Sequence, residues 1–141
     1  MSASSPTPPH DEREVLRLAL EQNRQAPGLA RAAITGFSED RDIDAATRAT
    51  LRLLVSEVVT NAVIHPDLEP PGDIHLCARI ASGMIRVEVT DEGTGFTPQP
   101  RDPERSERGY GLFLLDNQAA NWGVHQQDGN TVWFELSVQA A

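Results

Sequence analysis

The alternation of apolar and polar residues predicts a first strand and two helices in the first half of the chain. Residues 14–21 carry leucine at every second position, which is typical of a strand. Residues 27–37 are expected to form a short helix with one side toward the core, formed by Leu29, Ala33 and Phe37. The strongest helical spacing follows, capped by Asp44 and ended near His65 because Pro66 comes next. Its apolar residues are Leu51, Leu54, Val55, Val58, Val59 and Ala62.

A two-residue period predicts two hairpins in the second half of the chain. Residues 74–80 and 85–89 alternate in polarity on either side of the turn sequence Ser82-Gly83. Residues 122–127 and 131–138 are expected to pair across a turn at 128–130, and a further helix is expected to open at Gly109. These elements predict an α+β fold, with a mixed but mostly antiparallel sheet and helices on one face.

Length and composition leave room for one domain of ordinary globular character. The chain has 141 residues, 39% of them hydrophobic, and we expect a mobile tail over 1–12 and a single domain over 13–141. The N-terminus has no pattern of a signal peptide and no apolar run is long enough to span a bilayer, so we expect a cytoplasmic protein without membrane contact. The single Cys77 cannot form a disulfide within the chain.

The charged residues exclude several classes of function. The formal net charge is −9, which disfavours direct binding to nucleic acid or to an anionic membrane. All 12 basic residues are arginine, so the chain has no lysine for a P-loop, for a eukaryotic-type protein kinase or for a Schiff base. Any binding or transfer of ATP phosphates must therefore use groups other than a lysine amine.

Three polar clusters interrupt the apolar pattern. Glu57 and Asn61 share one face of the long helix and suit a general base beside an oxygen ligand for Mg²⁺, although an ordinary solvent face is the favoured explanation when the pair is taken alone. Asp91 follows a strand, with glycines two and four residues later, as a tight turn or a close-fitting ligand site would require. Residues 109–111 place two glycines at a helix start, where free amides would bind phosphate or where glycine simply makes a flexible loop-to-helix junction. The polar segment before them, over 96–108, is expected to be a lid or a binding loop.

Taken in order, these clusters resemble the GHKL (Bergerat-type) ATPases, and most closely the bacterial anti-sigma-factor serine kinases. The sequence Leu-Val-Ser-Glu-Val-Val-Thr-Asn-Ala-Val-Ile-His over 54–65 resembles their N-box, and 87–95 resembles their G1 box. Residues 108–112 resemble their G2 box, and 129–136 their last strand. The resemblance covers residues 14–138 and implies the GHKL two-layer α/β sandwich.

The resemblance implies a role for each matching residue. Asp91 would bind the adenine amino group, with Thr131 supporting the pocket, and Asn61 would hold Mg²⁺ against the phosphates of ATP. Glu57 would activate the attacking serine hydroxyl. The remaining positions would shape the pocket or contact the phosphates: Gly93, Gly95, Arg108, Gly109, Gly111 and Leu112. Two positions depart from the family: Ile64 replaces a common arginine, and Asn130 replaces a common lysine near the site.

Two functions of different classes follow from the resemblance. The first is an ATP-dependent serine protein kinase and anti-sigma factor, which would bind a sigma factor and phosphorylate a STAS-type anti-anti-sigma factor in a partner switch. The second is an ATP-binding regulatory module that sequesters a partner without phosphoryl transfer. A detached histidine kinase domain is disfavoured because the chain lacks a helical dimerisation region. A homodimer is compatible with the family, in which many members dimerise.

Overall fold

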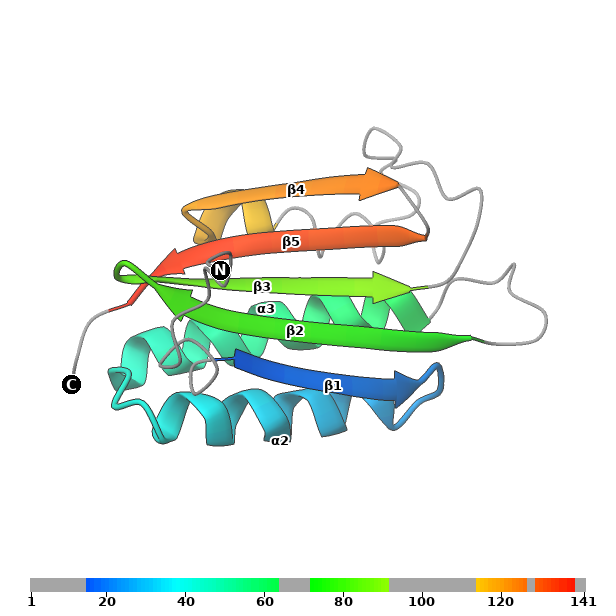
Figure 1. Cartoon of the computed structure of the whole chain (residues 1–141), viewed down its shortest axis with the longest axis horizontal. Helices are drawn as coiled ribbons and strands as arrows, with labels where there is room; N and C mark the ends of the chain where they lie inside the picture. Colours follow the sequence, from blue (N-terminus) through cyan, green and yellow to red (C-terminus); the bar gives the residue numbers. More distant parts are fainter. Residues whose placement is uncertain (1–14, 64–71, 92–113, 127–128, 139–141) are drawn as a thin grey trace, which may run out of the picture.

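The chain forms a two-layer sandwich in which two helices cover one face of an antiparallel sheet (Figure 1). The computed structural model describes residues 15–63, 72–91, 114–126 and 129–138. The sheet formed by these residues has the strand order β1-β2-β3-β5-β4, and each of its four pairings is antiparallel. This confirms the expected α+β fold with a mostly antiparallel sheet. The strands are β1 (Val15–Glu21), β2 (Asp73–Ala81), β3 (Met84–Asp91), β4 (Asn121–Gln126) and β5 (Asn130–Ser137).

Both expected hairpins form, but the two strands of the second begin and end one residue earlier in the chain than the sequence predicts. Ser82 and Gly83 connect β2 to β3 with φ angles of 55° and 76°, the two positive values of a type I′ turn. In the second hairpin, β5 begins at Asn130, which the sequence assigns to the turn. Asn130 is therefore a strand residue whose side chain has a fixed place opposite Asp91 of β3.

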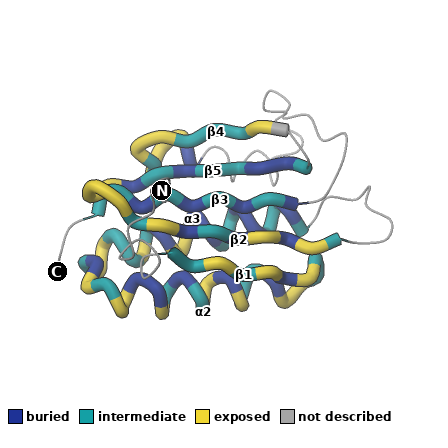
Figure 2. The backbone as a smooth tube through the Cα atoms, viewed as in Figure 1, coloured by how far each residue is buried: buried dark blue, intermediate teal, exposed yellow. Residues whose placement is uncertain are grey.

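Helix α2 (Ala26–Glu39) is longer than expected, and its buried side includes Phe37 as expected but not Leu29. Leu29 was expected on the buried side, yet its side chain is 56% exposed. The helix instead buries a stripe at spacings of three and four residues, which brings small alanine side chains against its neighbours. Figure 2 shows the resulting alternation of buried and exposed residues along α2. The buried residues of this helix are Ala26, Ala30, Ile34, Phe37 and Ser38.

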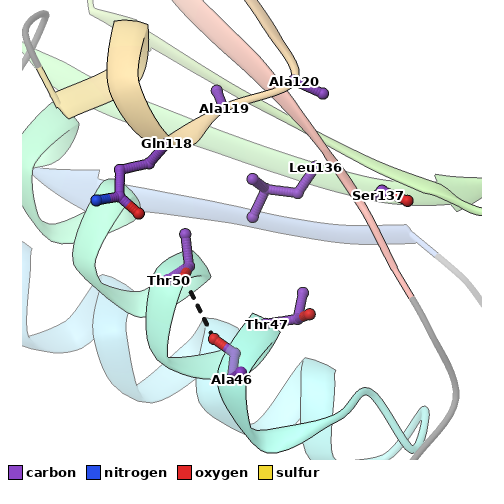
Figure 3. Close-up of a pocket in the computed structure, with 8 residues that line it drawn as sticks. All are labelled: Ala46, Thr47, Thr50, Gln118, Ala119, Ala120, Leu136 and Ser137. Carbon is purple, nitrogen blue, oxygen red and sulfur yellow. Dashed lines mark hydrogen bonds between the residues drawn. The ribbon is translucent and has the colours of Figure 1, made fainter.

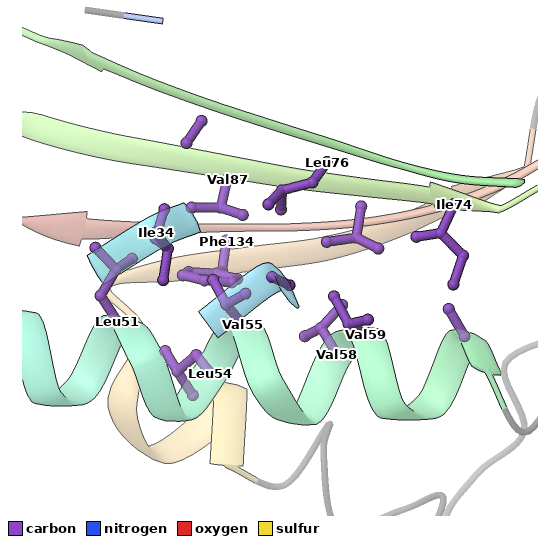
Figure 4. Close-up of a cluster of buried hydrophobic side chains, with 14 of the residues drawn as sticks. Ile34, Leu51, Leu54, Val55, Val58, Val59, Ile74, Leu76, Val87 and Phe134 are labelled. Atoms are coloured by element: carbon purple, nitrogen blue, oxygen red, sulfur yellow. The ribbon is translucent and has the colours of Figure 1, made fainter. Parts of the chain in front are cut away.

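Helix α3 (Ala45–Val63) forms the centre of the core, as its periodicity predicts. Its N-terminus is capped because the backbone N–H of Thr47 donates to Asp44 Oδ2 over 3.2 Å. All six apolar residues expected on its inner face are buried, and several point toward the sheet, where Val87 and Phe134 meet them (Figure 4). The expected end near His65 lies outside the described residues. Within the described chain, no helix combines the length and the apolar character needed to cross a membrane.

The opposite face of the sheet is polar around a half-buried tryptophan. Arg86 lies over the ring of Trp133, with its guanidinium carbon 4.1 Å from the ring centroid, and forms ion pairs with Glu88 and Glu135 at 2.8 and 3.1 Å. Partial burial alone would lower the pKa of Arg86, but the hydrogen bonds to the two carboxylates outweigh it and raise that pKa. Gly123 of β4 lies under the indole, where a Cβ atom would come within 2.7 Å of Trp133 Nε1.

Candidate functional site

The described part of the candidate site is built on a buried polar pair at one end of the sheet. Asp91 is the last residue of β3 and Asn130 the first of β5, and the two residues are directly paired across the strands. Asn130 Nδ2 donates a hydrogen bond to Asp91 Oδ1 over 3.1 Å. Their exposed fractions are only 8% and 4%. A carboxylate so far from solvent needs such partners, and the amide fixes its orientation.

Apolar side chains from the sheet and from α3 surround this pair and leave a small pocket of about 40 Å³. Asn61 extends into its lining from the C-terminal part of α3, opposite Asp91 on the sheet. A few polar groups set among apolar walls are typical of small-molecule binding sites. The lining residues are Val58, Asn61, Ala62, Val89, Asp91, Asn130 and Val132.

Glu57 and Asn61 lie at the edge of the core, as their position within an apolar helix face predicts. Both are half-buried, whereas the adjacent Val58 and Ala62 are buried. Their separation of four residues places them one helical turn apart on the same side of α3. Glu57 does not line the pocket that contains Asp91, so any role for its carboxylate lies beside this pocket rather than within it.

Thr131 is placed on the other face of the sheet from Asp91. It is paired with Thr90, and the two hydroxyl oxygens are 2.8 Å apart in a hydrogen bond. Because side chains alternate along a strand, a residue next to Asn130 cannot share its face. Asn130, and not Thr131, therefore faces the pocket beside Asp91. In the sequence, Asn130 stands out only as a departure from the family.

The other expected ligand-binding residues lie outside the described residues, so the structure does not test their place in the site. The same is true of Ile64 and His65, which follow α3. The expected ligand-binding residues in this group are Gly93, Gly95, Arg108, Gly109, Gly111 and Leu112.

The described residues provide only part of the coordination of a magnesium ion, as in sites where Mg²⁺ is bound together with a nucleotide. Across the described ranges there is no cluster of three or more histidine, cysteine or acidic residues that could bind a metal by itself. In nucleotide sites Mg²⁺ takes one or two protein oxygens and completes its coordination with phosphate and water. The amide of Asn61, at the rim of the pocket, supplies an oxygen of that kind.

A larger cavity of about 370 Å³ lies toward the other end of α3, between its first turns and the end of β5 (Figure 3). Thr47, Thr50, Gln118 and Ser137 contribute polar side-chain atoms to its lining. Thr50 Oγ1 donates back to the carbonyl oxygen of Ala46 over 3.2 Å. Among the described residues, none that is expected to bind a ligand and none with a charged side chain lines this cavity. The polar pair at the opposite end of the sheet is therefore the stronger candidate.

Two curated bacterial proteins with significant similarity carry the same name. The chain is 30% identical over 127 residues to an "Anti-sigma F factor" of Clostridium acetobutylicum, covering 82% of this chain and 85% of that protein. It is 28% identical over 114 residues to an "Anti-sigma F factor" of Halalkalibacterium halodurans, covering 74% of this chain and 78% of that protein.

Comparison with solved structures agrees with the architecture. A crystal structure of the RsbU and RsbW domains of a Mycobacterium tuberculosis protein aligns with a TM-score of 0.71 at 22% identity, covering 96% of this chain. This chain spans about a third of that longer one, 34% of its length, so the likeness bears on the fold. A comparison with protein families matches residues 18–136 to the family described as "Histidine kinase-like ATPase domain". Since that match covers most of the chain and agrees with the observed sheet and helices, the chain belongs to the histidine kinase-like ATPase domain family.

Proposed function

We propose that this chain binds ATP with Mg²⁺ and acts as an anti-sigma factor and serine protein kinase on a STAS-type anti-anti-sigma factor. The observation that carries the proposal is the buried Asp91–Asn130 pair, set in an apolar pocket that Asn61 completes from α3. The names of the similar bacterial proteins support the anti-sigma role.

Adenine recognition would fall to the sheet side of the pocket. The carboxylate of Asp91 accepts hydrogen bonds, so it would receive the exocyclic amino group of the base. Asn130 would hold that carboxylate in place through its existing hydrogen bond. The side chains of Val58, Val89 and Val132 would contact the faces of the ring, since they provide the apolar part of the lining.

The phosphates would extend from the base toward the C-terminal part of α3, where Asn61 lies. Mg²⁺, when bound, would neutralise part of the charge on the phosphates. Asn61 would provide one oxygen ligand for it from the rim of the pocket. The resemblance assigns Arg108 and the backbone amides of Gly109, Gly111 and Leu112 to the phosphates, and Gly93 and Gly95 to the floor of the site.

Phosphoryl transfer would use Glu57 as the general base. The carboxylate would accept the proton of the partner's serine hydroxyl while the oxygen of that serine forms a bond to the γ-phosphorus and the bond to the leaving ADP oxygen breaks. Glu57 is half-buried and one turn from Asn61, which leaves its carboxylate beside the nucleotide pocket. A protein serine could approach from that side.

The partners of the reaction follow from the same proposal. The chain would bind the sigma factor once the STAS-type protein is phosphorylated, because the unphosphorylated STAS-type protein would compete with the sigma factor for the kinase. The reaction would take place in the cytoplasm, and a homodimer would be its working unit. The net charge of −9 favours partners that present basic surfaces.

The substitution Glu57→Gln tests the kinase assignment. We expect phosphoryl transfer from radiolabelled ATP to a purified STAS-type partner to fall by about a hundredfold or more, with ATP affinity retained, because a general base typically contributes 10²–10⁴-fold. Glu39→Gln, at the exposed end of α2, is the matched control and should transfer phosphate like the wild type. Wild-type protein that binds ATP and a partner but transfers no phosphate would instead identify a regulatory module without kinase activity.

A further inference from the structure

One glutamine side chain joins three separate parts of the fold next to the candidate site. Gln22 follows directly after β1. Its Nε2 donates a 2.7 Å hydrogen bond to the carbonyl oxygen of Ala62 in α3, and its Oε1 accepts one from the backbone N–H of Gly72 over 3.2 Å. Its own backbone N–H donates to the carbonyl oxygen of Gly72 over 3.3 Å. Gln22 thus links the end of α3 with the residue that precedes β2.

The carbonyl that Gln22 binds has no backbone N–H donor at the position where an α-helix would supply one. A helical carbonyl accepts from the N–H four residues later, and residue 66 is proline, which has no N–H. Ala62 lies in the last described turn of α3, which is described to Val63. The end of β1, the end of α3 and the beginning of β2 meet at one end of the molecule (Figure 1). Gln22 therefore acts as a C-terminal cap for α3 from a different element.

This cap bears directly on the candidate site because Asn61 precedes Ala62. A helical turn that frays at Ala62 would move the Asn61 amide away from the pocket that it lines. Asp91 and Asn130 are independent of this support, since they belong to β3 and β5 and hold each other. The two halves of the site are thus fixed by different contacts.

We propose that Gln22 is a positioning residue that holds Asn61 in place for the magnesium-bound phosphates of the nucleotide, an inference that rests on the proposed function. The side chain must donate and accept at the same time, which a primary amide does and a carboxylate does not. Glutamate at this position would keep the bond from Gly72 but direct a carboxylate at the carbonyl oxygen of Ala62. Alanine would remove both bonds.

Hydrogen exchange on the free protein tests the structural step. In Gln22→Ala and Gln22→Glu, the backbone amides of residues 60–63 should exchange about tenfold faster or more than in the wild type, because the last turn opens more often. Gln25→Ala is the matched control, since Gln25 is an exposed glutamine in the same connection and makes no side-chain cap bond. Unchanged exchange at 60–63 in both Gln22 variants would overturn the inference.

Nucleotide binding tests the link to Asn61. By calorimetry in the presence of Mg²⁺, both Gln22 variants should bind ATP about tenfold more weakly than the wild type and Gln25→Ala, the size typical of losing a residue that orients a ligand group. With EDTA in place of Mg²⁺, their affinities should stay within about twofold of the wild type, because the base contacts are separate. Equal weakening with and without Mg²⁺, or none, would overturn this inference alone. A wild type that binds no ATP would overturn the proposed function and this inference with it.

Discussion

Replacing Asn130 with alanine tests whether the buried amide supports Asp91 as the structure indicates. The substitution removes the Nδ2 donor that is 3.1 Å from Asp91 Oδ1. Both residues are almost completely buried, at 4% and 8% exposure, so bulk water does not freely replace the lost bond. The carboxylate would lose a partner in a place where it is costly to lose one.

The expected loss of stability depends on the kind of hydrogen bond that is removed and on the pocket beside it. A hydrogen bond to a charged group contributes about 1.5–3 kcal/mol. The adjacent pocket of about 40 Å³ is large enough to admit a water molecule, which would partly replace the amide. We therefore expect a loss near the lower limit, about 1.5 kcal/mol in the free energy of unfolding.

Urea unfolding of a double-mutant cycle measures this loss. Asn130→Ala should cost about 1.5 kcal/mol in the wild type but less than about 0.5 kcal/mol when Asp91 is already alanine, because the bond is then absent. Asn121→Ala is the control, since its hydrogen bond to Glu135 is exposed. A cost that is the same in both backgrounds would show that Asn130 stabilises the fold without supporting Asp91, and would refute the reasoning.

Two further predictions concern regions away from the pocket: the polar face of the sheet and the N-terminal cap of α3. Gly123→Ala should destabilise the fold by about 1–3 kcal/mol, since its Cβ would lie 2.7 Å from Trp133 Nε1 and the indole would have to move; an unchanged melting temperature would contradict that packing. The pKa of Asp44 is lowered by the hydroxyl and then the backbone N–H of Thr47. A lowered pKa in the folded state means that the cap stabilises the fold above the ordinary aspartate pKa and that this contribution is lost as the pH falls through the lowered value. Asp44→Ala should therefore lose more stability in urea unfolding at pH 7 than at pH 3, and an equal loss at both would contradict the cap.

The main elements were predictable because their apolar periods are strong. Alternation located β2 and β3, and the spacing along α3 identified each of its buried residues. The buried side of α2 was predicted wrongly at Leu29, because a single large apolar residue outweighed a stripe that includes two alanines. Which side of a helix is buried depends on what it packs against, and periodicity alone does not contain that information.

The position of Asn130 in the candidate site could not be predicted from the sequence pattern either. The motifs identified Asp91 and Asn61, but the place of Asn130 depends on where β5 begins and on its register with β3. A shift of one residue exchanges the two faces of a strand, so the register decides between Asn130 and Thr131. Gln22 belongs to no motif, and its role depends on contacts with residues 40 and 50 positions away.

Calorimetric titration of ATP, with and without Mg²⁺, tests the central claim most directly. The proteins to compare are the wild type, Asp91→Asn and the control Asp73→Asn, which changes an exposed aspartate at the start of β2. We predict that Mg²⁺ strengthens ATP binding to the wild type and the control, and that Asp91→Asn abolishes it. The oxygen of an asparagine at this position would accept from Asn130 Nδ2, which leaves an NH₂ group that cannot accept the amino group of the base. Binding that is unchanged in Asp91→Asn, or no binding to the wild type at millimolar ATP, would contradict the account.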